Sequence, residues 1–112
     1  MLDALRQFKA AIFQALAHPT RVAIVEMLRD GEVSSGTIFE RLGIEPANCS
    51  QHLAVLRGRH IVVGRKEGNQ VFYSLRDPSI VQVLDILRAY FERHLTESLG
   101  ILNEMSERPA AD

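Results

Sequence analysis

The sequence has little cysteine, no tryptophan and no long apolar run among its 112 residues. A single cysteine excludes an internal disulfide framework and is typical of a reducing cytoplasm, where we expect the protein to act. No apolar run approaches the roughly 18 residues of a membrane span, and the N-terminus lacks a signal-peptide pattern. The sequence also has no glycine-rich phosphate loop and no motif-like arrangement of serine, histidine and aspartate, so we do not expect an enzyme.

Positive charge is concentrated in one part of a chain whose formal net charge is -1. Residues 44–76 carry five basic side chains against two acidic ones, whereas residues 77–112 carry three against seven. The basic residues of this region are Arg57, Arg59, Arg65, Lys66 and Arg76. A local positive field beside an acidic segment suggests one face that meets a polyanion.

Apolar spacing and capping residues predict four helices in the first half of the chain. Leucine, isoleucine and phenylalanine recur at helical spacing over residues 2–17. Pro19 fits a first helical position, and Gly31 is placed to end this second helix. A short third helix follows the capping residue Ser34, and a fourth begins at Pro46 and ends near Gly58.

The period then changes from 3.6 to 2, which predicts a hairpin of residues 61–66 and 70–75. A last helix starts at Asp77-Pro78 and carries an apolar stripe to Met105. The order α-α-α-α-β-β-α describes a mainly α fold with a β-hairpin wing, a winged helix-turn-helix. We expect residues 1–108 to form this single domain, with a loose tail at 109–112.

The fourth helix has one face suited to a core and another suited to DNA. Cys49, Leu53 and Leu56 share the apolar face. The opposite face is small or amide-bearing, so it can enter the major groove and bond base edges. The predicted base-contacting residues are Asn48, Ser50 and Gln51. The side chains predicted to contact the backbone or the minor groove are Arg57, Arg59, Arg65, Lys66, Asn69 and Gln70.

Three stretches resemble the ArsR family of bacterial winged-helix repressors: ALAHPTRVAIVEML at 15–28, CSQHLAVLR at 49–57 and GRKEGNQVFYSL at 64–75. The resemblance implies homodimers that bind inverted-repeat operators in double-stranded DNA and that an effector ligand usually releases. By position, the resemblance also assigns His52 to the DNA-contacting residues of the fourth helix. The residues alone leave two roles equally open for His52, which are contact with a phosphate and packing.

The apolar stripes of residues 2–17 and 78–105 are longer than a small helical core needs. Pairing these stripes with a second copy would bury apolar surface that otherwise stays exposed to solvent. This predicts a homodimer through the first and last helices. The alternative is that both helices pack only on their own domain. A second reading of the whole chain is a winged-helix adaptor that binds protein and does not read DNA.

Metal-sensing members of the family use cysteines on the third helix, or an Asp-x-His with a distal histidine pair on the last helix. This chain has no cysteine on the third helix, and only Asp77 matches the second pattern. His94 and Glu97 lie one helical turn apart, which is half a zinc or nickel site. We therefore expect no metal site, with Asp77, His94 and Glu97 as weak candidates. Cys49 is expected to act as a small core residue rather than a redox sensor.

Overall fold

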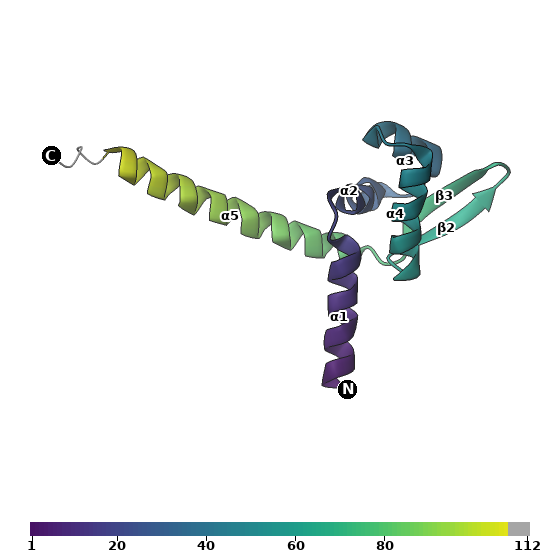
Figure 1. Ribbon diagram of the computed structural model, residues 1–112, viewed down its shortest axis with the longest axis horizontal. Coiled ribbons are helices and arrows are strands. Elements are labelled where there is room, and N and C mark those ends of the chain that lie inside the picture. Colours follow the sequence, from purple (N-terminus) through teal and green to yellow (C-terminus); the bar gives the residue numbers. More distant parts are fainter. Residues whose placement is uncertain (108–112) are drawn as a thin grey trace. The chain divides into compact units, whose positions relative to one another are not determined.

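The computed structural model describes residues 1–107, and the chain divides into two compact units, residues 1–81 and the residues from 82 onward. The elements of the first unit are α1 (Leu2–Leu16), α2 (Pro19–Met27), a 3-10 turn η1 (Leu28–Asp30), β1 (Val33–Ser34), α3 (Ser35–Leu42), α4 (Pro46–Gly58), β2 (Val62–Glu67) and β3 (Gln70–Leu75). Helix α5 (Ser79–Glu107) begins at the end of the first unit and forms the second (Figure 1). The predicted helices and hairpin are therefore confirmed, with boundaries that move by at most four residues.

Helices α2 and α3 begin at side chains that satisfy their free amide groups. His18 accepts a hydrogen bond from Thr20 N–H through Nδ1 at 3.1 Å, and Pro19 follows as the first helical residue. Ser34 Oγ accepts from Thr37 N–H at 3.2 Å. Gly43 ends α3 in the left-handed region, with φ 64°. Helix α3 is thus fixed at both of its ends.

The sheet has three antiparallel strands in the order β1-β3-β2, not the two that the sequence predicts. Strand β1 has only two residues, and Val33 pairs with Tyr73 across from it. So short a strand has no alternation to detect. Strands β2 and β3 pair from Val62↔Leu75 to Glu67↔Gln70 around a two-residue loop. Gly68 takes φ 61° there, as the first loop residue of a tight hairpin can require.

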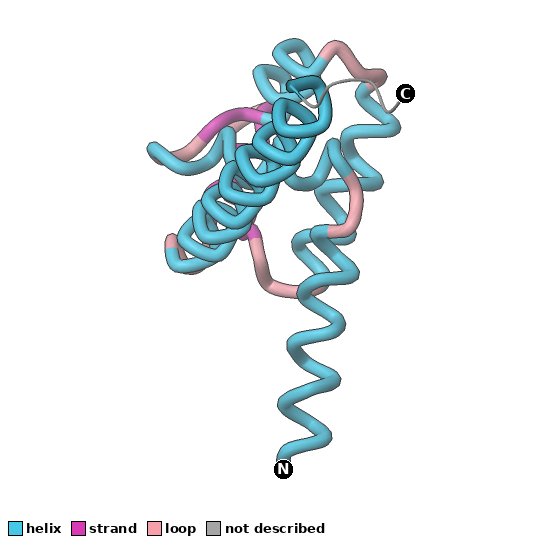
Figure 2. Tube along the Cα trace, turned by 90° about the vertical axis from the view of Figure 1, so that its left-hand side faces the viewer, coloured by secondary structure: helices cyan, strands magenta, loops and turns pink. Residues whose placement is uncertain are grey.

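The core of the first unit lies where α2, α3 and α4 meet the sheet. Its most deeply buried side chains are Ile24, Val25, Leu28, Ile38, Cys49, Leu53, Leu56 and Val62. Helix dominates the trace, and the strands are short beside it (Figure 2). This core holds α4 by its inner face and leaves the outer face of α4 in solvent.

The N-terminal part of α1 extends away from the rest of the first unit (Figures 1 and 2). Only Ala15 and Leu16, at its C-terminal end, are buried. Leu2, Leu5 and Phe8 stay exposed, and Phe8 exposes 62% of its surface. The N-terminal half of the apolar stripe of α1 therefore stays largely uncovered by the described part of its own chain.

Helix α5 starts at Ser79, where Asp77 Oδ1 accepts the Ser79 N–H at 2.9 Å, so the predicted start is confirmed. The helix continues to Glu107, slightly beyond the predicted apolar stripe. Past Leu84 its large apolar side chains are exposed, including Phe91, Leu95 and Leu102. No helix within residues 1–107 is long and apolar enough to cross a membrane. The predicted loose tail at 109–112 lies outside the described residues.

Candidate nucleic-acid interface

Helices α3 and α4 form the helix-turn-helix, and α4 presents the face that the sequence assigns to DNA. Cys49, Leu53 and Leu56 are at most 2% exposed, and they fix the rotation of α4 about its axis. Asn48, Ser50 and Gln51 are exposed on the other side. An outer face of short polar and amide side chains can approach base edges closely and donate or accept hydrogen bonds there.

His52 does not belong to this exposed face. It is only 9% exposed, and its Nδ1 lies 3.2 Å from an NH of the Arg21 guanidinium. Arginine can only donate, so Nδ1 accepts this hydrogen bond and the ring proton sits on Nε2. The assignment of His52 to the DNA-contacting set is thus corrected, because a buried ring cannot reach a groove. Of the two roles that the residues left open, the structure shows packing.

Arg21 joins three helices around His52. Its Nε donates to the Ala15 carbonyl at 2.6 Å, and an NH group reaches the Gln14 carbonyl at 3.5 Å. The His18 ring lies 4.3 Å from the His52 ring, centroid to centroid. Burial lowers the pKa of His52, and the nearby His18 and Arg21 lower it further. A neutral His52 therefore ties α4 to α2 and to the end of α1.

The wing contains an ion-pair network that the sequence did not reveal. Arg65 donates to both carboxylate oxygens of Glu32, at 3.0 and 2.9 Å, and to Glu67 at 2.6 Å. Its guanidinium also lies over the Phe72 ring, 5.0 Å from the centroid. The Arg65 hydrogen bond lowers the pKa of Glu32, and both carboxylates raise the pKa of Arg65. Arg65 therefore links the wing to the segment before β1.

The remaining predicted contacts are exposed and reach outward from two places. Arg57 and Arg59 lie in the last turn and at the C-cap of α4. Lys66, Asn69 and Gln70 lie around the hairpin loop. Among residues 1–107, Lys66 makes no ion pair, in contrast to Arg65. The structure thus brings a polar helix face, a basic helix end and a hairpin into one unit, with α4 packed beside the hairpin (Figure 1).

Comparison with known proteins gives this arrangement a family. A helix-turn-helix domain family matches residues 16–65. Rv0081, an uncharacterized HTH-type transcriptional regulator of Mycobacterium tuberculosis, is 35% identical over 104 residues, which cover 92% of this chain and 91% of the relative. The biofilm growth-associated repressor of Agrobacterium fabrum is 37% identical over 82 residues, 73% of this chain and 70% of its own. This chain belongs to the ArsR family of winged helix-turn-helix transcriptional regulators.

Solved structures agree with this membership of the ArsR family. The crystal structure of M. tuberculosis Rv0081 matches with a TM-score of 0.77 at 36% identity, covering 85% of this chain and 96% of that one. The homodimeric winged helix-turn-helix domain of Mb0332 from Mycobacterium bovis, a possible ArsR-family regulator, has a TM-score of 0.76. It is 24% identical and covers 85% and 88% of the two chains, which shows the shared fold.

Cys49 of this ArsR-family chain is a core residue by its position. It is 1% exposed on the inner face of α4. Burial raises the pKa of its thiol, so the uncharged form is favoured. Reaction with an oxidant requires the thiolate and access to it, and burial disfavours both.

The three weak metal candidates of the ArsR-type sequence do not form a described site. The Asp77 carboxylate accepts the Ser79 N–H, which lowers its pKa. His94 and Glu97 line the same small pocket on α5. Within residues 1–107, no group of three or more histidine, cysteine, aspartate or glutamate side chains is placed to hold a metal ion.

Proposed function

We propose that this chain is a cytoplasmic, homodimeric repressor that binds an inverted-repeat operator in double-stranded DNA. The observation that carries the proposal is α4 itself, whose inner face is buried and whose outer face exposes Asn48, Ser50 and Gln51. A helix held in this way presents its polar side chains to the major groove as a fixed set. Residues 1–108 act as one functional domain in this proposal.

The contacts divide into those that read bases and those that hold the backbone. Gln51 and Asn48 each carry an amide, which can bond adenine at two atoms, and Ser50 accepts several partners. Arg57 and Arg59 at the end of α4 meet phosphates. In the wing, Lys66 supplies the positive charge, and Asn69 and Gln70 hydrogen-bond the backbone or the minor groove. Arg65 contributes by holding the wing in place, because Glu32 and Glu67 already occupy its guanidinium.

Self-association through α1 and α5 supplies the symmetry that an inverted repeat needs. Both helices expose apolar side chains that a second copy can cover, such as Phe8 on α1 and Phe91 on α5. A dimer then carries two α4 helices, one for each half-site. Divalent metal is not part of the proposal, because the described residues bring no complete set of ligands together.

Two substitutions test which side chains contact bases and which contact the DNA backbone. Gln51→Ala should cost about 1–3 kcal/mol on the preferred operator and relax specificity at one base pair. Lys66→Ala should weaken operator and random duplex alike, and should flatten the slope of log K against log salt by about 0.9 for each protomer, which is about 1.8 for the dimer. Fluorescence anisotropy with both duplexes at several salt concentrations measures these effects. Equal losses from both variants on operator and random DNA would contradict the assignment.

The same titration separates this function from the protein-binding adaptor. A regulator that neutralises phosphates loses affinity steeply as salt rises, whereas an adaptor binds no duplex at any salt concentration. The relatives described above are transcriptional regulators, and no described contact favours the adaptor. Enzyme activity is likewise not part of the proposal.

A further inference from the structure

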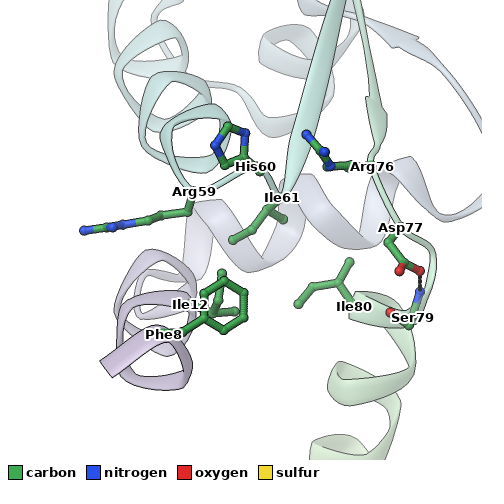
Figure 3. A pocket seen from close by; sticks show the side chains of 9 residues that line it. All are labelled: Phe8, Ile12, Arg59, His60, Ile61, Arg76, Asp77, Ser79 and Ile80. Atoms are coloured by element: carbon green, nitrogen blue, oxygen red, sulfur yellow. Dashed lines mark hydrogen bonds between the residues drawn. The ribbon is translucent and has the colours of Figure 1, made fainter. Parts of the chain in front are cut away.

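Helix α1 meets the rest of the first unit mainly at its C-terminal end. Ala15 and Leu16 are the buried residues of this helix. Nearer its N-terminus, Phe8 and Ile12 line a cavity of about 520 Å³, and Ile61, which follows α4, lines it as well (Figure 3). The helix is therefore not packed closely against its own chain at that level, so a firm link between α1 and α4 is to be sought near Ala15.

The carbonyl groups at the end of α1 are bonded by a residue of the next helix. A helix leaves its last four carbonyl groups without a partner inside the helix, and basic side chains commonly bond them. Helix α1 has no basic residue in its own last turn. Instead, Arg21 of α2 donates from Nε to the Ala15 carbonyl at 2.6 Å and from Nη2 to the Gln14 carbonyl at 3.5 Å. Its charge also lies at the negative end of the helix dipole, which favours the contact.

The same guanidinium reaches the recognition helix with its third nitrogen. Nη1 of Arg21 lies 3.2 Å from Nδ1 of His52, which is 9% exposed and belongs to the inner face of α4. A guanidinium is planar and its donors point in fixed directions, so these three bonds restrain how the end of α1 and α4 lie relative to each other. A lysine ammonium is one charge on a flexible stem and cannot make the same set of bonds. Arg21 is thus a rigid link between α1 and α4.

A dimer on an inverted repeat needs a defined distance between its two α4 helices. That distance has to match the distance between the half-sites, and it depends on every link between the dimer contact and α4. In the dimer proposed above, α1 belongs to the dimer contact. One base pair inserted between the half-sites turns one of them by about 35° around the DNA axis relative to the other. Only a dimer whose α4 helices can move relative to α1 binds both spacings well.

We propose that Arg21 is a positioning residue that sets the half-site spacing recognised by the dimer, because it fixes α4 relative to α1. This inference rests on the proposed function, since it requires a homodimer on an inverted repeat. Arg21 contacts no DNA in this account, because each of its three nitrogens is already bonded to Ala15, Gln14 or His52. Its substitution therefore changes how strictly spacing is recognised and leaves the charge that meets phosphates unchanged.

The test compares three duplexes by fluorescence anisotropy: an operator selected by the parent from random sequences, the same operator with one base pair inserted between its half-sites, and a random duplex. The inserted base pair should weaken binding of the parent at least about tenfold. Arg21→Lys keeps the charge but loses the planar set of donors, so its affinity for the correct operator should fall and the insertion should cost it less than about threefold. Its affinity for random duplex and its salt slope should match those of the parent.

Two controls accompany this comparison. Arg6→Lys makes the same chemical change on α1 away from the link, where the arginine pairs with the exposed Asp3 at 3.6 Å, and it should keep the spacing discrimination of the parent. Circular dichroism and sedimentation establish that each variant is folded and dimeric.

Variants of His52 keep the test decisive if Arg21→Lys does not fold or does not dimerise. His52→Leu removes the acceptor on α4 and leaves the bonds from Arg21 to α1, so it should lose spacing discrimination. His52→Asn keeps an acceptor for Arg21 and should retain the discrimination. The rescue by asparagine separates a link through this hydrogen bond from simple filling of the core.

Spacing discrimination equal to that of the parent in Arg21→Lys, or in both His52 variants, would overturn the proposal. Equal weakening of Arg21→Lys on all three duplexes would overturn it as well, because that is the result of a lost phosphate contact or a general loss of structure. A parent dimer that binds both operator spacings equally would leave Arg21 no spacing to set. A parent that is monomeric, or that prefers no duplex over random DNA, would instead contradict the proposed function, so the two failures are distinguishable.

Discussion

Helices α4 and α5 both carry apolar stripes, but only α4 has its stripe covered. On α4, Cys49, Leu53 and Leu56 are at most 2% exposed. On α5, the large apolar residues past Leu84 are 44% exposed or more, as at Leu95 and Phe91. The packing of the recognition helix is therefore completed within its own chain. The described residues leave the apolar face of α5 exposed. A helix that pairs with a second copy requires such an exposed apolar face.

The contrast separates two tasks that the chain performs with different surfaces. Burying a leucine or phenylalanine side chain stabilises a protein by roughly 1.5–3 kcal/mol. In α4 this stabilisation fixes the polar face before DNA is present, so little order remains to be gained on binding. In α5 the same stabilisation is available only on association, so it contributes to dimer affinity.

The largest expected effect comes from a charge in the uncovered stripe of α5. Leu95→Glu should convert the dimer into monomers, because the carboxylate would have to be desolvated in the interface. A monomer has one α4 helix instead of two linked ones, so operator binding should weaken on the order of 100-fold or more. Sedimentation and anisotropy measure the two effects. Ala89→Glu, on the opposite face of α5, is the matched control, and dissociation of both variants would show that the stripe is not the interface.

A charge in the covered stripe of α4 should act differently. Cys49→Asp places an unpaired carboxylate in the core and should detach α4 from the first unit, abolishing DNA binding while the dimer persists. Cys49→Val keeps an apolar side chain of similar size and should cost under about 1.5 kcal/mol. Urea unfolding, sedimentation and gel shifts compare them. If Cys49→Val bound DNA normally but lost a peroxide response that the parent has, the thiol would be a sensor after all.

Smaller effects should distinguish the two basic residues of the wing. Arg65→Gln removes the links to Glu32 and Glu67 and should weaken operator and random DNA similarly through a looser wing. Because Arg65 is already paired, the salt slope should stay as in the parent. Lys66→Ala should instead flatten that slope by about 0.9 for each protomer of the dimer. A slope change of the same size in Arg65→Gln would mean that Arg65 leaves its carboxylates and contacts a phosphate.

The smallest expected effect concerns pH and His52. Folding lowers the pKa of His52 from its value near 6.5 in the unfolded chain. When the pH falls below 6.5, the unfolded chain therefore binds a proton at His52 more readily than the folded chain does. Stability should therefore fall as the pH drops through this range, where protonated His52 would face Arg21 and His18. His52→Asn keeps an acceptor for Arg21 but does not titrate. Urea unfolding at pH 7.5 and 5.5 should show a smaller pH dependence in His52→Asn, and an unchanged one would contradict this account.

Local patterns in the sequence predict most of this fold. Capping residues and apolar spacing identify the five α-helices but not η1; His18, Ser34 and Asp77 act on residues within three positions of themselves. The exposed face of α4 follows from the same spacing. What the sequence does not reveal joins distant residues. Arg65 meets Glu32 from 33 positions away, and His52 meets Arg21 from 31, and no periodicity connects either pair.

The shortest strand determines where the chain can tolerate added residues. Ser34 belongs to β1, where it pairs with Phe72 of β3, and it is also the N-cap of α3. No residue therefore separates the end of β1 from the start of α3. An insertion beside Ser34 would break the pairing or the cap. The Gly68-Asn69 loop joins only β2 and β3, and its neighbours are exposed. Added length is therefore best placed at this loop, where a peptide tag or a longer wing can be grafted while the sheet and the turn into α3 stay intact.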